Sequence, residues 1–200
     1  MNSTATLETG GSLRLFLALL LPHDATDAIV RWSERHLDRG RRPESLHITL
    51  AFLGERPATE LEAIVGALRE SAASARFFTL ALARYRESRS VGMLVLDDRT
   101  GEAARLAGAL QGRLEELGSY RRERRPWLPH VTVLRFRERP RLRPPVAQLQ
   151  AELGSFAPSE AAAFLSRLHP RSAARDGGAA GARYEVLETC RLSSSELNLS

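Results

Sequence analysis

The sequence predicts an α+β protein made of two related lobes, and two observations support this. Segments with the period-two alternation of strands alternate along the chain with amphipathic helical segments, and several strand pairs could form antiparallel hairpins. In addition, the pattern His-apolar-Thr-apolar occurs twice, at 47–50 and 130–133, each time inside an apolar strand segment. Because similar strand, helix and hairpin segments surround both copies, we expect two lobes that face each other.

The first half of the chain is expected to form four strands and two helices, with one helix after each of the first two strands. Leu15, Leu17 and Leu19 alternate with other residues, which predicts the opening strand. Asp24 is the expected N-cap of the first helix, and the second helix follows Pro57. The expected elements are strand 14–20, helix 25–39, strand 46–53, helix 58–73, and strands 77–83 and 91–96 joined by a polar turn at 84–90.

The second half repeats this alternation. Leu106, Leu110 and Leu114 form an apolar stripe at helical spacing, and Gly118 follows the expected end of that helix. The expected elements are helix 100–117, strand 128–136, a short helix at 145–153, and strands 162–168 and 184–192. Between the last two strands, residues 171–182 are rich in Gly and Ala and are expected to form a flexible turn.

The length favours one domain. Two hundred residues suffice for a single compact unit or for two small lobes that share a core. We expect a disordered leader at 1–12, one bilobal domain at 13–192 and a polar tail at 193–200. The apolar run 15–21 is far shorter than the ~20 residues that a membrane span requires, and it does not follow a basic segment as in a secretory signal. The sequence therefore predicts a soluble, cytoplasmic protein with no membrane association.

The charge of the chain favours polyanionic partners. The formal net charge is +5, and all 29 basic residues are arginine. The planar guanidinium group can donate two parallel hydrogen bonds to a phosphate, although a high-GC genome would also explain the arginine bias. Cys190 is the lone cysteine and cannot form an internal disulfide. No residues have the spacing of a metal site, so we expect no metal or other cofactor, and a monomer with no obligate protein partner.

The repeated pattern predicts a catalytic site. Side chains alternate along a strand, so His47 and Thr49 share one face, ~7 Å apart, and His130 and Thr132 do the same. Two such faces across a cleft would surround one small volume with two imidazoles and two hydroxyls. A neutral and a protonated histidine can coexist near neutral pH, which suits in-line cleavage of a phosphodiester by a base and an acid. The hydroxyls can donate to the non-bridging oxygens.

A single His-x-Thr in a strand usually indicates only a half-buried strand with polar residues outside. Two copies in similar surroundings, in contrast, indicate a catalytic pair. The remaining histidines do not belong to such a pattern. His23, His36 and His169 are interpreted as surface or structural residues.

These residues resemble the 2H phosphoesterase superfamily, which is named for two His-x-Thr motifs, and within it the RNA 2′,3′-cyclic phosphodiesterases once called 2′-5′ RNA ligases. The resemblance covers about 14–192. It rests on the opening strand Arg-Leu-Phe-Leu-Ala-Leu, on Leu-His-Ile-Thr-Leu-Ala-Phe-Leu-Gly-Glu at 46–55, and on Trp-Leu-Pro-His-Val-Thr-Val-Leu-Arg at 127–135. The second motif departs mildly, with Val133-Leu134 where Leu-Ala is more common.

The resemblance implies a bilobal α+β fold with two antiparallel sheets, flanking helices, a central cleft and pseudo-twofold symmetry. It implies hydrolysis of a terminal RNA 2′,3′-cyclic phosphate to a 2′-phosphate without a metal. It also implies that His47 donates a proton to the leaving 3′ oxygen and that His130 accepts one from water. The residues alone do not assign these roles, since the motifs are nearly symmetric. Thr49 and Thr132 would hold the phosphate.

Other candidates lie near the motifs. Arg135 is a phosphate-binding candidate, but simple alternation from Thr132 points it away from the cleft unless a bulge or the strand end intervenes. Phe16 and Trp127 are candidates for stacking on a base, with core packing as the alternative. The basic loop 121–125 could follow an RNA backbone or be an ordinary solvated loop. Tyr184 is interpreted as structural.

Three other functions remain open at this point. A ligase that runs the reaction in reverse and makes a 2′-5′ bond would use the same residues. A non-catalytic nucleotide- or RNA-binding module could use the same cleft, although both histidines are present. A plain Arg-rich RNA-binding protein would keep its binding after loss of both histidines.

Overall fold

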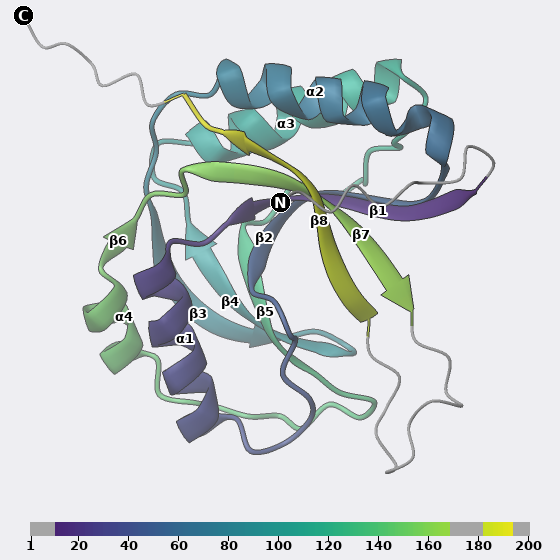
Figure 1. The fold of residues 1–200 in the computed structure, drawn as a ribbon. Helices are drawn as coiled ribbons and strands as arrows, with labels where there is room; N and C mark the ends of the chain where they lie inside the picture. Colours follow the sequence, from purple (N-terminus) through teal and green to yellow (C-terminus); the bar gives the residue numbers. More distant parts are fainter. Residues whose placement is uncertain (1–10, 169–181, 194–200) are drawn as a thin grey trace, which may run out of the picture.

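The computed structural model describes residues 11–168 and 182–193. Within these ranges, eight strands form one antiparallel sheet in the order β6-β3-β4-β5-β2-β1-β7-β8, which curls with the helices along its outer side (Figure 1). The elements are β1 Ser12–Leu20, α1 His23–His36, β2 His47–Pro57, η1 Ala58–Glu60, α2 Leu61–Ala73, β3 Leu80–Glu87, β4 Val91–Asp97, α3 Glu102–Glu116, β5 His130–Arg135, α4 Ala147–Leu153, β6 Ser155–Phe156, β7 Glu160–Leu168 and β8 Ala182–Arg191.

The expected α+β class is confirmed, but the expectation of two separate sheets is wrong. The motif strands β2 and β5 are neighbours, and their ladder pairs a single couple of residues, Ile48 with Val131. This contact joins β6-β3-β4-β5 to β2-β1-β7-β8. The two halves are lobes of one continuous sheet, which is nearly divided at the β2–β5 junction. Sequence patterns give no direct information on such a long-range pairing.

Several element boundaries differ from those expected. Helix α1 starts one residue before Asp24, because the carbonyl of Pro22 already accepts a hydrogen bond from Thr26 N, at 2.9 Å. Strand β3 extends to Glu87 and so includes much of the segment expected to be a polar turn. The two-residue strand β6 was not expected. Strand β3 therefore starts three residues later than expected and adds residues 84–87 to the sheet, including two arginines.

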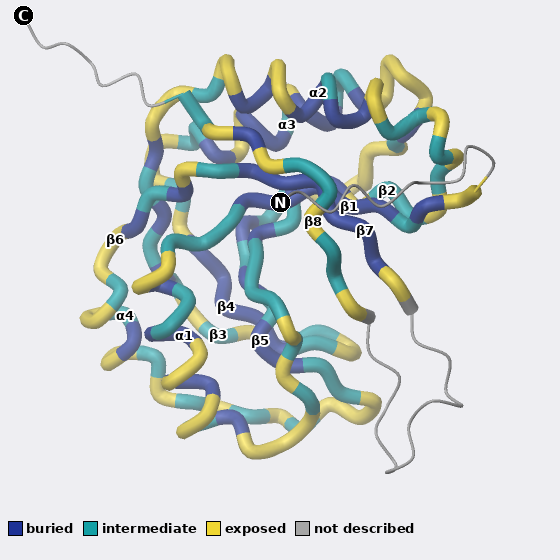
Figure 2. Tube along the Cα trace, viewed as in Figure 1, coloured by how far each residue is buried: buried dark blue, intermediate teal, exposed yellow. Residues whose placement is uncertain are grey.

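One core lies between the sheet and the helices. Helix α4 packs on β3 and α1 packs on α4, while α2 packs on β7 and β8 and α3 packs on β2. Figure 2 shows buried residues on the central strands and on the inner sides of the helices. Burying one such leucine or isoleucine contributes about 1.5–3 kcal/mol. The largest fully buried side chains are Leu15, Leu17, Leu19, Ile29, Ile48, Leu50, Ile64, Leu68, Leu80, Leu94, Leu110 and Leu114.

We call the sheet surface turned away from these helices the concave face. It carries a second, smaller apolar cluster made of Phe16, Ala18, Ala162 and Phe164, with Leu20 and Tyr184 against it. Phe16 and Ala18 alternate along β1 with leucines that belong to the main core. The part of the concave face formed by β1 and β7 is therefore apolar.

Some expectations fall on residues outside the described ranges. These are most of the leader, nearly all of the tail, His169 and most of the Gly/Ala-rich segment. Ser12 starts β1, although it was assigned to the leader. None of the helices in the described ranges is long and apolar enough to cross a membrane. Cys190 is buried near the end of β8.

Candidate active site

The pairing of β2 with β5 brings the two motifs together. In an antiparallel pair with Ile48 opposite Val131, His47 comes opposite Thr132 and Thr49 comes opposite His130. Ile48 and Val131 point into the core, so the histidines and threonines point to the concave face. The β2–β5 ladder contains this one pair, whereas β2 pairs along β1 and β5 pairs along β4. The expected grouping of two imidazoles and two hydroxyls is therefore built around the junction of the lobes.

Each motif strand has a bulge immediately after its threonine. Ala18 pairs with Thr49 but Leu17 pairs with Ala51, which leaves Leu50 as the extra residue of β2. In β5, the corresponding extra residue is Val133, since Met93 pairs with Thr132 and Gly92 with Leu134. A bulge inserts one residue and so changes the face on which the following residues lie.

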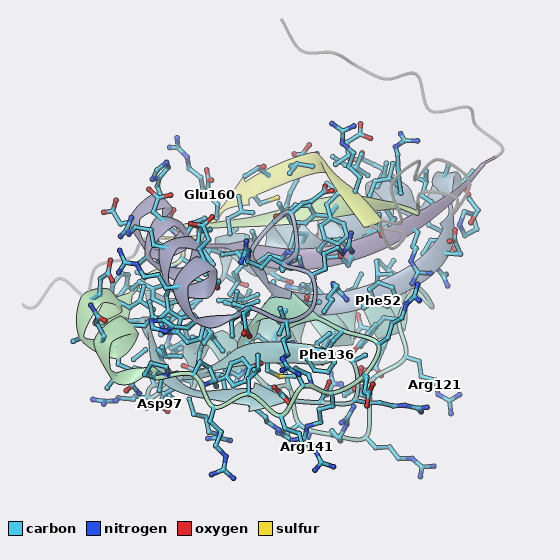
Figure 3. The ribbon with its side chains drawn as sticks, turned by 90° about the horizontal axis from the view of Figure 1, so that it is seen from below. Phe52, Asp97, Arg121, Phe136, Arg141 and Glu160 are labelled. Carbon is cyan, nitrogen blue, oxygen red and sulfur yellow. The ribbon has the colours of Figure 1, made fainter. Side chains whose placement is uncertain are left out.

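These bulges return the fifth residue after each histidine to the concave face. Arg135, which simple alternation points away, regains the face of Thr132, as a bulge was expected to allow. Phe52 occupies the equivalent position in β2 and pairs with Phe16. Phe52 is 50% exposed, and its ring centroid lies 4.9 Å from the guanidinium carbon of Arg14; it is labelled in Figure 3. Phe52 was not identified from the sequence, although it and Arg135 share the same offset from their histidines.

The loop before each motif is bound to the strand of the other motif. Arg41 and Arg135 exchange two backbone hydrogen bonds, of 2.8 and 2.7 Å. Trp127 donates its indole N–H to the carbonyl of Thr49, at 2.9 Å. Gly40 permits the first contact, because it has φ +87° and a β-carbon there would lie 2.7 Å from the Arg135 carbonyl oxygen. These contacts hold the two strands where their own ladder has ended.

His47 lies among aromatic rings. Its ring centroid is 4.9 Å from that of Phe16, 5.7 Å from Phe164 and 5.5 Å from Tyr184, the last edge-on. Burial lowers the pKa of His47 to about 4, and the positive charge of Arg135 adds to this effect. The Ser45 backbone opposes the shift. The buried Nδ1 of His47 forms no hydrogen bond of ordinary geometry with the described residues.

This pKa predicts a stability that falls in acid. The unfolded chain takes up a proton on His47 near pH 6.5, but the folded chain does so only near pH 4. Between these values the unfolded state binds more protons, so the free energy of unfolding decreases as the pH falls and the contribution disappears above pH 7. Urea unfolding at pH 7 and pH 4.5 should show a loss that is larger in the wild type than in His47→Gln by about 2–3 kcal/mol. Equal losses in the two proteins would contradict the lowered pKa.

His130 has a different environment. Its Nδ1 lies 2.8 Å from the carbonyl oxygen of Leu128. A carbonyl can only accept a hydrogen bond, so Nδ1 carries the proton. A neutral His130 then has its lone pair on Nε2, at the opposite edge of the ring. The two histidines thus differ in surroundings although their motifs are nearly identical.

Arg135 connects the two lobes across the concave face. Its Nη2 donates to the hydroxyl of Tyr184 on β8, at 3.3 Å. Tyr184 also contacts His47 edge-on, so its ring and its hydroxyl link His47 to Arg135. The hydroxyls of Thr49 and Thr132 have no hydrogen-bond partner within the described part of the chain, which leaves both free to bind a ligand.

The two aromatic candidates are placed differently from Phe52. Phe16 is only 3% exposed, and its ring stacks on Phe164 at 4.8 Å, so it lies beneath His47. Trp127 is half-buried, packs against the main core and is bound to Thr49 through its indole N–H. Of Phe16, Trp127 and Phe52, the last is the most exposed.

Other candidates lie apart from this group. In the basic loop, Arg122 pairs with Glu115 and Arg125 pairs with Glu123, while Arg121 points outward at the edge of the molecule (Figure 3). His23 pairs with Asp27, and His36 contacts Trp32 on the same helix. In residues 11–168 and 182–193, no three His, Cys, Asp or Glu residues gather as a potential metal site.

Comparisons with known proteins agree with this arrangement. The sequence matches the 2′-5′ RNA ligase superfamily over residues 21–169. It is 33% identical over 132 residues to the RNA 2′,3′-cyclic phosphodiesterase of Escherichia coli (strain K12), a match that covers 61% of this chain and 71% of that protein.

Solved structures show the same similarity in three dimensions. E. coli LigT complexed with phosphate has a TM-score of 0.67 at 25% identity, over 92% of this chain and 99% of that chain. A structure described as a phosphoesterase has a TM-score of 0.71 at 27% identity, over 92% and 100% of the two chains. The protein TT0787 of Thermus thermophilus has a TM-score of 0.68 at 25% identity, also over 92% and 100% of the two chains.

Proposed function

Because this chain belongs to the 2′-5′ RNA ligase superfamily and is a phosphoesterase of that kind, we propose that it hydrolyses RNA 2′,3′-cyclic phosphate ends to 2′-phosphomonoesters. The observation that carries this proposal is the β2–β5 junction, where one residue pair sets His47 and His130 on the same face of one sheet. The related E. coli protein is named for a 2′,3′-cyclic phosphodiesterase activity, which supports the choice of substrate.

His130 is the proposed base. Its Nδ1–H is held by the Leu128 carbonyl, so the neutral ring offers the lone pair of Nε2. Water loses a proton to this nitrogen as its oxygen bonds to phosphorus. The bond from phosphorus to the 3′ oxygen breaks, and the phosphate stays on the 2′ oxygen. A positioned base of this type contributes about 10²–10⁴-fold to a rate.

His47 is the proposed acid that protonates the leaving 3′ oxygen. Its pKa of about 4 makes it neutral at pH 7 in the protein alone. The anionic cyclic phosphate would counter the charge of Arg135 and favour the protonated ring, so His47 gains its proton as the substrate binds. The aromatic rings around His47 exclude water and strengthen this electrostatic interaction.

The remaining residues position the phosphate and the nucleoside. Arg135, Thr49 and Thr132 are proposed to donate to the non-bridging oxygens, where charge is concentrated in the transition state. Phe52 is the proposed platform for the terminal base, because it is more exposed than Phe16 and Tyr184 on this face. Trp127 is proposed to position the first motif through Thr49. Phe16 is proposed to support the ring of His47 from below.

The proposal includes a monomer that acts in the cytoplasm without a metal, another cofactor or an obligate protein partner. Ligation through a 2′-5′ bond uses the same groups in reverse and is the second candidate, favoured by the name of the superfamily. Because water is present in large excess over RNA 5′ ends, the hydrolytic direction is expected to dominate. A binding module without turnover would not require one histidine with a fixed Nδ1–H and another with a lowered pKa.

An RNA oligonucleotide that ends in a 2′,3′-cyclic phosphate tests the proposal when a 5′-hydroxyl acceptor RNA is also present. We expect conversion to the monoester, with joined product as a minor species. Mainly joined product would favour the ligase. Tight binding without either product would overturn the enzymatic proposal and favour the binding module.

A further inference from the structure

Two rows of side chains run outward from the second motif across the concave face. Residues paired between neighbouring strands lie on the same face of a sheet. His130 pairs with Val95 of β4, and Val95 pairs with Arg84 of β3. Thr132 pairs with Met93, and Met93 pairs with Arg86. Arg84 and Arg86 therefore lie on the face of the proposed catalytic residues, two strand spacings or roughly 10 Å from them.

Tyr85 confirms this orientation because it lies between the two arginines. Its ring points to the helix-covered side, where its centroid is 6.4 Å from that of Trp32 on α1. Alternation then directs Arg84 and Arg86 to the concave face. Both are exposed. The sequence assigned them to a polar turn, which gave no reason to place them near the motifs.

The corresponding rows from the first motif have a different chemistry. Thr49 pairs with Ala18, which pairs with Ala162 of β7. Phe52 pairs with Phe16, which pairs with Phe164. These rows present alanine and aromatic rings where the rows of the second motif present arginine. The arginine beside them, Arg14, lies over the Phe52 ring and 4.0 Å from the Glu55 carboxylate. The concave face therefore has a basic half and an apolar half, which meet at the two histidines.

The basic half lacks compensating charge. Neither Arg84 nor Arg86 forms an ion pair with any residue of the described ranges, although two like charges two residues apart on one strand repel each other. Asp97 shares this face at the far end of β4, but it is paired with Arg99, at 3.3 Å. Figure 3 shows Asp97 at the opposite side of the view from Phe52. An anion from outside the protein would relieve this repulsion.

We infer that Arg84 and Arg86 form a subsite for the phosphodiester on the 5′ side of the terminal nucleotide, so that the enzyme prefers an oligonucleotide end to a single nucleotide. This inference rests on the proposed function. In a 2′,3′-cyclic end both the 2′ and 3′ oxygens belong to the ring, so the RNA can continue only through its 5′ oxygen. With the cyclic phosphate between the histidines and the base on the apolar half, the next phosphate reaches the basic half.

The test compares two substrates in the same enzyme, a nucleoside 2′,3′-cyclic phosphate and a trinucleotide with the same terminal nucleotide. The double variant Arg84→Gln/Arg86→Gln should lower kcat/KM for the trinucleotide by roughly tenfold or more, as expected for the loss of charge-assisted contacts. Its kcat/KM for the mononucleotide should change less than twofold. The variant should also flatten the salt dependence for the trinucleotide, since each lost phosphate contact lowers the slope by about 0.7.

Arg35→Gln serves as a control for the loss of an exposed arginine elsewhere on the surface, because Arg35 is an exposed residue of α1. It removes one charge from the protein without altering the concave face, and we expect it to leave the ratio of the two kcat/KM values unchanged. Equal kcat/KM for the two substrates in the wild type, or equal losses on both in the double variant, would overturn the subsite. Failure to hydrolyse either substrate would instead overturn the proposed function.

Discussion

Replacement of His130 with glutamine is expected to lower turnover of a cyclic phosphate end by about 10²–10⁴-fold. Glutamine keeps a polar side chain of similar length but cannot accept the proton from water at neutral pH. His47→Gln should cause a loss of the same order because the leaving oxygen then departs without a proton. The turnover of the double variant should be only slightly lower than that of the less active single variant, since the two histidines act as a unit. Initial rates on the oligonucleotide measure all three.

His36→Gln is the control for these variants, because it removes a histidine from α1 and leaves both motifs intact. We expect it to retain turnover close to that of the wild type. Circular dichroism should show unchanged folding in every variant, since the motif histidines lie on the concave face and not on the helix-covered side of the sheet. Turnover within a few-fold of wild type in either motif variant would rule out paired-histidine catalysis.

Arg135→Gln should give the second large effect, a loss of about 10²-fold in kcat/KM. The guanidinium group is proposed to bind the phosphate, and its charge is also a cause of the lowered pKa of His47. Its removal should therefore raise the pKa of His47 in the protein alone, which NMR titration of the ring can follow. A merely structural role for Arg135 would not couple these two readouts.

Tyr184→Phe separates the charge of Arg135 from its hydrogen bond. This variant removes the hydroxyl that accepts from Nη2 but keeps the guanidinium and the aromatic ring. We expect a loss of less than about tenfold, with the pKa of His47 still lowered. A Tyr184→Phe loss as large as that of Arg135→Gln would assign the effect to the position of the guanidinium instead of its charge.

The sequence predicted most of the fold because its strands and helices have clear hydrophobic periods. The leucines of β1 and the stripe at Leu106, Leu110 and Leu114 are buried as expected. The number of sheets was wrong because it depends on one pair, Ile48 with Val131, whose partners are far apart in the chain. Local alternation specifies which side of a strand is apolar but not which strands become neighbours.

The site was predicted in part. The repeated motif gave the histidines and threonines, which the structure brings to one face. Arg135 could not be placed by alternation, because the bulge at Val133 changes the face within the strand. Phe52 was missed although the repeat contained the signal, in its equal offset from the motif histidine. Arg84 was missed because a charged segment resembles a turn until the register of β3 is known.

The most direct measurement is the hydrolysis of a nucleoside 2′,3′-cyclic phosphate by the wild-type protein in EDTA, with the product isomers separated by phosphorus NMR. We expect turnover to the 2′-phosphomonoester, which would establish the reaction, the leaving oxygen and the independence from divalent metals together. Formation of the 3′-phosphomonoester would contradict the assigned leaving group. Absence of turnover on this substrate and on a short RNA with the same end would contradict the account as a whole.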